Sequence, residues 1–398
     1  MIVFRLAAAL FLVQAGFHAY TAAMPLALAH AGTPDAAIGL VMGISAVVQI
    51  PAAIAGGRLL DAFGGNRLFT AGGLCYLAAT GILLLPGVDP AGSLAPFVAA
   101  RVLQGFGIGL ALPSALTMVP HLVPAARVSS GLAYIGAAQN LTLVVLPVLS
   151  IAVLNATGLD GVATMVVAFV VAGLVLGQRL PVRVPVTTSA GAMGAAQRRY
   201  GITFRREWAV PLLIVVTYVA HWGAVTAYLP VRAEAAGADI GLYFAADGIA
   251  IFLMRLPTGP LVARFTLRAL IITGAGMTAV AISMLLLPLT TPLLIVSGLL
   301  GGAGGAIVMT PVTIELARRS SDADRGSAFA LFSGSLAGAI AIGSIGGAPI
   351  VALVGLSAAL VVGIGLIGVT IALAAGDRSL AERVTAGTPT VEPAPQVS

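Results

Sequence analysis

The first long apolar stretch of the chain, residues 4–29, reads FRLAAALFLVQAGFHAYTAAMPLALA. A helix needs ~20 apolar residues to cross the hydrocarbon core of a bilayer, and this stretch exceeds that length. Comparable stretches lie at about residues 37–57, 67–86, 95–119, 129–154, 161–180, 208–230, 240–263, 268–288, 291–316, 327–354 and 356–375. Each can span a bilayer with some tilt. The sequence therefore predicts an all-α membrane protein with twelve transmembrane helices.

The composition excludes a soluble protein of this size. Hydrophobic residues make up 59% of the chain and charged residues only 9%, with a mean hydropathy of +1.07. A soluble domain of 398 residues needs more charge than this to cover its surface. The solvent around most of the chain is therefore lipid.

The distribution of arginine predicts the topology. The chain has twenty arginines and no lysine, with a net charge of +6. Only Arg232 falls in a loop on one side, and Arg101 and Arg255 lie within spans. The others fall on the opposite side: Arg5, Arg58, Arg67, Arg127, Arg179, Arg183, Arg198, Arg199, Arg205, Arg206, Arg264, Arg268, Arg318, Arg319, Arg325, Arg378 and Arg383. This bias marks a cytoplasmic face, so we expect a plasma-membrane protein with both termini in the cytoplasm, attracted to anionic lipid and not to nucleic acid.

The first stretch also has features of a cleavable signal peptide. Arg5 precedes an apolar run, and Ala29-His30-Ala31 resembles a cleavage site. The run is too long for a signal core, however, and it contains Gln14, His18 and Pro25. We therefore expect it to remain as the first span. Cys75 is the only cysteine, so no intrachain disulfide can form.

The two halves of the chain resemble each other. Ile38-Gly39-Leu40 returns as Ile240-Gly241-Leu242, an offset of 202 residues, and Pro113 and Arg127 return as Pro311 and Arg325 at an offset of 198. The longest loop separates these halves. The sequence thus predicts a six-helix bundle at residues 1–180, a basic cytoplasmic linker at 181–207, a second six-helix bundle at 208–376 and a disordered cytoplasmic tail at 377–398. A parallel repeat places a substrate near the membrane midplane, between two bundles related by an axis along the membrane normal.

The loop between the second and third spans carries a recognisable motif. It reads GRLLDAFGGNR over residues 57–67, with Gly57, Leu59, Asp61 and Gly64 at the positions that define the cytoplasmic loop signature of the major facilitator superfamily, which the chain therefore resembles. Ala62, Gly65 and Asn66 stand where that signature is usually basic, which leaves Arg67 and Arg58 as the nearby cations. The resemblance implies the two-bundle fold of that family. It also implies that Asp61 contacts the start of the eleventh span near Gly326 when the transporter faces outward; the alternative is a solvated turn.

The fourth span begins with a second motif, Arg101-Val102-Leu103-Gln104-Gly105-Phe106-Gly107. It is similar to the fourth-helix motif of proton-coupled facilitators, especially drug/proton antiporters. The resemblance implies a role for Arg101 in proton coupling and for Gln104 and Gly105 in the conformational switch, together with Gly57, Asp61, Gly64 and Arg67. A charge within a span is unfavourable by ~2.5–3.5 kcal/mol, so Arg101 should face the interior and have a partner; the alternative is a side chain that reaches back to the interface. In the fifth span Pro147 remains, but the glycines that flank it in antiporters are absent.

Polar residues within the other spans are the remaining candidates. Asp247 is the only acid deep in a predicted span, and we predict that it binds the coupling proton with Arg255, His221 or Arg101 nearby; the alternative is a structural pair with Arg255. His18 and His221 titrate near neutral pH and are further proton-coupling candidates, unless they are neutral hydrogen-bonding groups between helices. The predicted substrate-binding residues are Gln14, Phe17, His18, Thr21, Tyr134, Gln139, Asn140, Tyr218, His221, Trp222 and Arg255. Glu315 is expected to pair with Arg318 and Arg319 at the membrane interface.

These features predict a proton-coupled exporter of a drug-like molecule or small metabolite that works by alternating access. The alternative is an uptake symporter or facilitator for a small organic anion or sugar, with Arg101 and Arg255 as anion ligands. A membrane receptor would not need buried ionisable groups, and no nucleophile–base pair suggests an enzyme. The expected partners are a small-molecule substrate, protons and membrane lipid, with no cofactor and no metal, and we expect a monomer.

Overall fold

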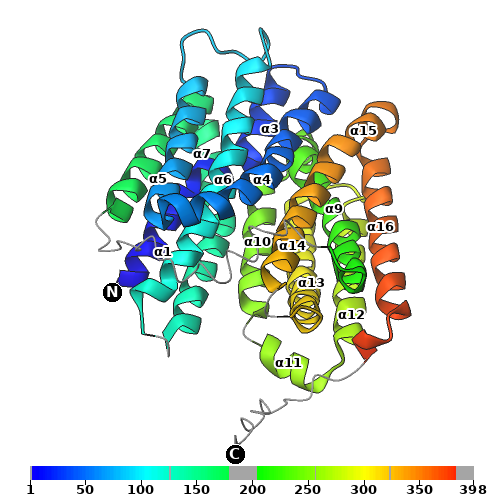
Figure 1. The fold of residues 1–398 in the computed structure, drawn as a ribbon. Coiled ribbons are helices and arrows are strands. Elements are labelled where there is room, and N and C mark those ends of the chain that lie inside the picture. The colour runs from blue at the N-terminus through cyan, green and yellow to red at the C-terminus, as the bar shows by residue number, and fades with distance from the viewer. Residues whose placement is uncertain (1, 125–126, 179–203, 256, 322–323, 382–398) are drawn as a thin grey trace, which may run out of the picture.

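The computed structural model describes residues 2–124, 127–178, 204–255, 257–321 and 324–381, with the side chains of residues 57, 58, 61, 129, 258, 259 and 325 left out. The described residues form helices joined by short connections (Figure 1). Most of the predicted linker, residues 181–203, and most of the predicted tail, residues 382–398, lie outside them.

The first half of the chain forms one bundle of helices (Figure 1). Its first crossing is built from three short helices because the helix is interrupted at Gln14 and Ala19. The elements are α1 (Ile2–Val13), α2 (Ala15–His18), α3 (Tyr20–His30), α4 (Asp35–Phe63), α5 (Gly65–Leu83), α6 (Ala95–Leu122) and α7 (Val128–Gln178). Gly158 interrupts α7 with a φ of 75° and a ψ of −171°, a conformation that only glycine adopts readily. The chain turns back there, so α7 contains two crossings.

The second half forms a matching bundle beside the first (Figure 1). Its elements are η2 (Arg206–Trp208), α9 (Ala209–Ala235), α10 (Ile240–Met254), α11 (Thr258–Arg264), α12 (Leu267–Met284), α13 (Thr291–Arg318), α14 (Arg325–Ala341), the π-helical η3 (Ile342–Gly346), α15 (Ala348–Val354), α16 (Leu356–Gly376) and η4 (Ser379–Ala381). Side-chain caps begin several of these helices: Thr266 accepts from the backbone amide of Ala269, and Asp239 accepts from that of Gly241. Such caps satisfy amides that have no partner within the helix.

The number of spans differs from the predicted twelve when only length and hydropathy are counted. In the described part of the chain, nine helices are long and apolar enough to cross a membrane. The difference lies in three places: α7 is counted once although Gly158 divides it, α5 is not among the nine, and α10 has only 15 residues. Large apolar side chains such as Leu353 and Phe4 are 84% and 70% exposed. An outer surface of this kind suits contact with lipid tails.

Glycines bring the helices of each bundle into close contact. A Cβ on Gly105 of α6 would lie 2.6 Å from the carbonyl oxygen of Ser45 in α4, and one on Gly72 of α5 would lie 2.9 Å from the amide nitrogen of Ala111. Real Cβ atoms do not approach so closely, so only glycine permits these helix separations. Small residues at helix contacts are the usual means of packing in membranes, where the hydrophobic effect does not drive helices together.

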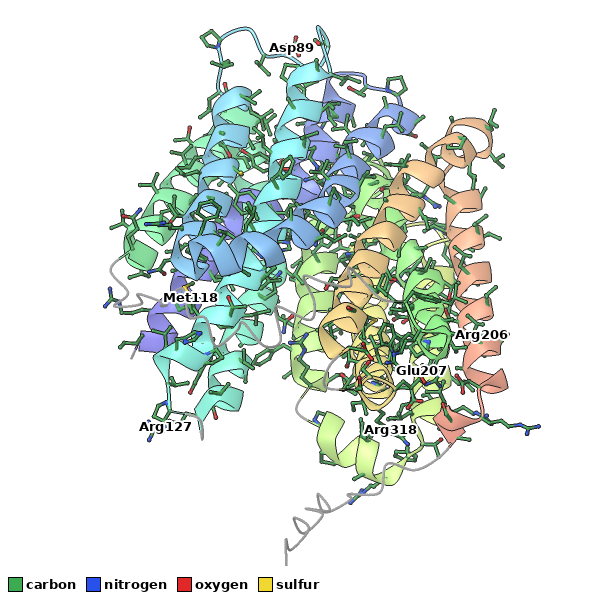
Figure 2. The ribbon with its side chains drawn as sticks, in the orientation of Figure 1. Asp89, Met118, Arg127, Arg206, Glu207 and Arg318 are labelled. Atoms are coloured by element: carbon green, nitrogen blue, oxygen red, sulfur yellow. The ribbon has the colours of Figure 1, made fainter. Side chains whose placement is uncertain are left out.

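The two bundles contact each other most tightly at one end of the molecule. Asp89 lies at this end, and Arg127 and Arg318 lie at the other (Figure 2). At the Asp89 end, a Cβ on Gly39 of α4 would lie 2.7 Å from the carbonyl oxygen of Ser344, and it would overlap the hydroxyl group of Tyr228. The hydroxyl group of Tyr228 donates to that same carbonyl at 2.5 Å.

Further along the same pair of helices the contact loosens. Cβ atoms on Gly338 and Gly334 of α14 would lie 4.0 and 3.9 Å from Ile50 of α4. At the Asp89 end, Nε2 of His30 and Oε2 of Glu234 also join the two halves at a hydrogen-bonding distance of 2.8 Å. The structure is therefore closed at the Asp89 end.

Candidate functional site

Arg101 lies within the first bundle and is only 3% exposed. Its Nη1 donates to Oε1 of Gln104 at 2.8 Å, and its Nη2 donates to the carbonyl oxygen of Met42 at 2.8 Å and to Oγ of Ser45 at 2.7 Å. The guanidinium group also stands 5.0 Å from the ring centroid of Phe17, a distance that permits a cation–π interaction. The side chain thus faces the interior, where polar groups of α4 and α6 hold it.

No acid among the described residues pairs with Arg101. Its Nε and the Nε2 of Gln104 are buried and have no hydrogen-bond partner there. Both are donors, so this part of the bundle presents positive potential and spare N–H groups. An acceptor group or a negative charge on a ligand would satisfy them.

Four further side chains form a hydrogen-bonded chain beside this cation. Tyr76 donates to Oε1 of Gln14 at 2.9 Å, and Nε2 of Gln14 donates to Oε1 of Gln139 at 2.7 Å. The amide nitrogen of Gln139 then lies 3.1 Å from Nε2 of His18. Since an amide nitrogen can only donate, His18 accepts at Nε2 and carries its proton on Nδ1. The predicted residues Gln14, His18 and Gln139 therefore meet in one network.

Asp247 lies in the second bundle, on α10, and is 5% exposed. Within the described part of the chain its carboxylate forms no ion pair or hydrogen bond, so it does not contact Arg255 in this structure. The side chain faces α13 and α9: a Cβ on Gly301 would lie 3.8 Å from Oδ1 of Asp247, and Tyr218 and Tyr243 are close enough to interact with its charge.

Tyr218 connects this carboxylate to further polar and aromatic side chains. The hydroxyl groups of Tyr218 and Thr278 are 2.7 Å apart, and Nδ1 of His221 donates to the carbonyl oxygen of Tyr218 at 2.5 Å. His221 packs edge-on against the Tyr218 ring at 5.3 Å, and Trp222 packs edge-on against Phe244 at 6.0 Å. Of the predicted residues of the seventh span, Tyr218 therefore lies beside Asp247, whereas His221 packs against Tyr218 and lies next to Gly363 of α16.

The remaining predicted substrate-binding residues are not brought into these two clusters. Asn140 is 5% exposed, with a buried Nδ2 that has no partner in the described residues. Arg255 is exposed, and its Nη1 lies 3.6 Å from where a Cβ of Gly136 would stand. Tyr134 is 57% exposed, and Thr21 is half-buried.

The predicted switch motif lies at the end of α4. The helix ends at Phe63, and Gly64 turns the chain into α5 with a φ of 81°. Arg67 is exposed. The side chain of Asp61 lies outside the described residues, as does the structure around residues 322–323 before the eleventh span.

The comparison with protein families agrees with this architecture. The model of the Major Facilitator Superfamily matches residues 6–239 and 233–394, which together cover nearly the whole chain. The chain belongs to the major facilitator superfamily. It is therefore a multi-pass secondary transporter of small molecules and not an enzyme.

Solved structures of this superfamily share the fold of the transporter. A D-xylose-proton symporter superimposes with a TM-score of 0.75 at 17% identity, covering 97% of this chain and 98% of the other. The nucleoside transporter NupG gives a TM-score of 0.74 at 12% identity, covering 95% and 98%. The human organic anion transporter MFSD10 (TETRAN) gives 0.68 at 16% identity, covering 94% and 98%. No curated protein sequence matches the chain.

The sequence did not reveal several residues of the transporter's two clusters. Ser45 and Tyr76 contact Arg101 and Gln14, yet a serine and a tyrosine in an apolar run are usually packing residues. The repeat could have indicated Ser45, because this residue is equivalent to Asp247 at the offset of 202 residues. Thr278, the partner of Tyr218, corresponds in the same way to Tyr76.

A third polar cluster lies at the Arg127 end of the second bundle. As predicted, Glu315 pairs with Arg318 at 3.3 Å and with Arg319 at 2.8 Å. Arg319 also pairs with Asp377 at 2.6 Å and bonds to Ser379, so the first residues of the predicted tail are held against the bundle. Burial alone would raise the pKa of Asp377, but its hydrogen bonds to Arg319 and Ser379 lower the pKa below the usual value.

Proposed function

We propose that this transporter couples the export of a drug-like molecule or small metabolite to proton entry by alternating access. Asp247 carries the proposal: it is a buried carboxylate with no ion pair or hydrogen bond in the described part of the chain. An ionisable group inside a membrane span is a functional-site hypothesis by default. Because Asp247 has no partner there, it can gain and lose a proton without breaking a salt bridge.

The conformation of the structure supports the loading step of such a cycle. The arginine-rich side marks the cytoplasmic face, and Arg127 and Arg318 lie opposite the closed Asp89 end (Figure 2). On this assignment both termini are cytoplasmic, and substrate enters the closed-outside conformation from the cytoplasm. The Gly57–Arg67 loop, together with Gln104 and Gly105, would stabilise the opposite conformation through Asp61.

The proton gradient supplies enough free energy for this cycle. A single charge that crosses a potential of 100 mV gains ~2.3 kcal/mol. At ~1.4 kcal/mol per tenfold change in concentration, that gain supports a substrate gradient of roughly 50-fold. A pH gradient of the same sign adds to it.

An uptake symporter or facilitator for a small organic anion or sugar is the second candidate. The spare donors of Arg101 and Gln104 favour it because an acceptor-rich ligand would satisfy them. Among the proteins with this fold, one is a D-xylose-proton symporter and one an organic anion transporter. In this candidate Arg101 and Arg255 bind the substrate.

Transport into proteoliposomes separates the two candidates. With an inward proton gradient, an exporter expels preloaded substrate, whereas a symporter accumulates it. The Asp247→Asn variant should lose gradient-driven flux but keep exchange of labelled for unlabelled substrate, since exchange needs no net proton movement. Gly276→Ala is the matched control, because a Cβ on Gly276 meets nothing within 4 Å. Unchanged gradient-driven flux in Asp247→Asn would exclude Asp247 as the coupling acid.

A further inference from the structure

The space beside Asp247 differs from the rest of the contact between α10 and α13. Cβ atoms on Gly298 and Gly302 would strike the backbone of Tyr243 and Asp247, so these two glycines serve the close approach of the helices. A Cβ on Gly301 would lie 3.6 Å from Cβ of Ala281 and 3.8 Å from Oδ1 of Asp247, which are ordinary contact distances. The helix therefore leaves a space of about one methyl group directly beside the carboxylate.

Two hydroxyl groups and an aromatic ring lie one turn further along α13. One turn along α13, a Cβ on Gly305 would lie 3.5 Å from the hydroxyl oxygen of Tyr218, which is 2.7 Å from that of Thr278. A carboxylate and two hydroxyl groups are hard oxygen donors for a cation. Aromatic rings also attract cations through their faces, and the Tyr218 ring is next to the carboxylate.

The equivalent place in the first bundle already holds a cation. Asp247 corresponds to Ser45 in the repeat, and Gly302 and Gly105 lie against the backbone carbonyls of these two residues. Four residues earlier on each of these helices stand Gly298 and Arg101. In the first bundle the guanidinium group of Arg101 donates to Ser45 at 2.7 Å. When the helices are aligned on these two glycine contacts, an offset of 197 residues and one residue from that of Pro113 and Pro311, a glycine stands in place of the arginine and an acid in place of the serine.

We propose that the space between Asp247, Tyr218 and Gly301 binds a compact monovalent cation, either an alkali ion or a primary ammonium group. This inference rests on the proposed function and adds to it the class of the transported or coupled ion. A bound cation neutralises the buried carboxylate of Asp247, which no described residue neutralises. It supplies the positive charge that Arg101 supplies in the other bundle. The space beside Gly301 admits a small ion or an –NH3+ group but not a quaternary ammonium.

Binding of the cation displaces a proton from the same carboxylate. The neutral carboxylic acid releases H+ to water, and the carboxylate that remains holds the cation, so the charge of the pocket is zero before and after. The other titratable groups that interact with the charge of Asp247 are Tyr218 on α9 and Tyr243 on α10, and His221 lies beyond Tyr218, packed against its ring; within the described residues α7, α12 and α13 present none to the carboxylate. His221 is therefore the group whose titration must be separated from that of Asp247.

The test uses the purified full-length protein in lipid nanodiscs. Thermal unfolding is followed across a pH series with sodium chloride, methylammonium chloride or tetraethylammonium chloride, at constant ionic strength maintained with N-methylglucamine chloride. Sodium or methylammonium should raise the Tm, with an apparent affinity that increases with pH, whereas tetraethylammonium should not. A response to sodium alone identifies an alkali ion as the ligand, and a response to methylammonium alone identifies an ammonium group. Either outcome supports the site. No response to either cation would overturn it.

Two variants and two controls locate the site. Asp247→Asn should abolish the response. Gly301→Ala, which fills the space without a steric clash, should weaken the apparent affinity at least about tenfold, and Gly276→Ala should leave it unchanged. In weakly buffered solution, binding should release about one proton per cation, and His221→Gln should release the same amount. An equal response in Asp247→Asn, or proton release that disappears with His221, would refute the inference.

The same preparation separates this inference from the proposed function. Proton-driven export without cation binding would leave the proposed function standing and remove the cation site. Cation binding without any proton-driven flux would leave the cation site standing and remove the proposed function.

Discussion

Replacement of Gly39 by alanine should open the Asp89 end of the transporter. Gly39 belongs to the first bundle, whereas its neighbours Tyr228 and Ser344 belong to the second, so the contact exists only while this end is closed. An added Cβ would lie 2.7 Å from the carbonyl oxygen of Ser344 and 2.5 Å from Cζ of Tyr228. The carbonyl is backbone and the tyrosine ring is rigid and buried, so neither can move aside without separating the bundles.

The size of the effect follows from this overlap. Overpacking of a well-packed contact is unfavourable by ~1–3 kcal/mol, and the penalty here falls on the closed conformation alone. A free-energy difference of that size changes the ratio of open to closed molecules by roughly 5- to 150-fold. The ratio of molecules open at this end to closed ones should therefore rise by that factor.

The assay is the distance between spin labels on the two bundles. Labels at Ala91 and Ala236, in a Cys75→Ser background, lie in exposed positions at the Asp89 end of each half. Electron–electron double resonance should show a longer distance in Gly39→Ala than in the parent protein. Gly274→Ala is the matched contrast because its Cβ would lie 2.7 Å from the carbonyl oxygen of Gly304 within the second bundle, which should lower the Tm and leave the distances unchanged. An unchanged distance distribution in Gly39→Ala would refute the proposed role of this contact.

Three smaller predictions concern the polar clusters. Arg101→Met should lower the Tm and abolish transport, because Ser45 and its neighbours lose charge-assisted hydrogen bonds; retained transport would show that Arg101 is structural only. Gln139→Leu interrupts the buried hydrogen-bonded chain and should reduce stability by about 0.6–1.7 kcal/mol, measured by unfolding in nanodiscs. Because the folded-state pKa of Asp377 is lowered, its pairing with Arg319 stabilises the fold above the ordinary carboxyl pKa and is lost as pH falls through the folded value. The hydrogen-exchange protection factors of residues 377–381, corrected for the intrinsic pH dependence of amide exchange, should fall on acidification, and Asp377→Asn should remove most of that fall.

The fold followed from the sequence because lipid imposes a simple rule on it. Backbone polar groups must be satisfied within each span, so apolar stretches become helices, and the boundaries at residues 95, 240, 291 and 356 agree with the structure. The repeat and the GRLLDAFGGNR motif then identified the family. Local interruptions were not predictable: the breaks at Gln14 and Ala19 and the π-helical turn at Ile342–Gly346 depend on neighbouring helices.

The sequence predicted the ionisable residues of the two polar clusters but not the groups that contact them. An ionisable residue in a span is visible in the sequence, so Arg101, Asp247 and His18 were found. Their partners include the carbonyl oxygen of Met42, which no residue pattern reveals. The absence of a described partner for Asp247 could not be read from sequence either, because Arg255 lies only eight positions away on the same span.

The difference between the two halves explains how a protein built from a repeated bundle can transport in one direction. The repeat places Ser45 and Asp247 in equivalent positions, and the same glycine contacts bring α6 and α13 against them. In the first bundle the positive charge is covalently part of the protein and remains throughout the cycle. In the second, the charge that neutralises Asp247 must come from solution, as a proton or as the compact cation proposed above. The occupancy of Asp247 in the second bundle therefore changes with the proton and cation concentrations of the compartment that the site faces. The positive charge of Arg101 in the first bundle does not change.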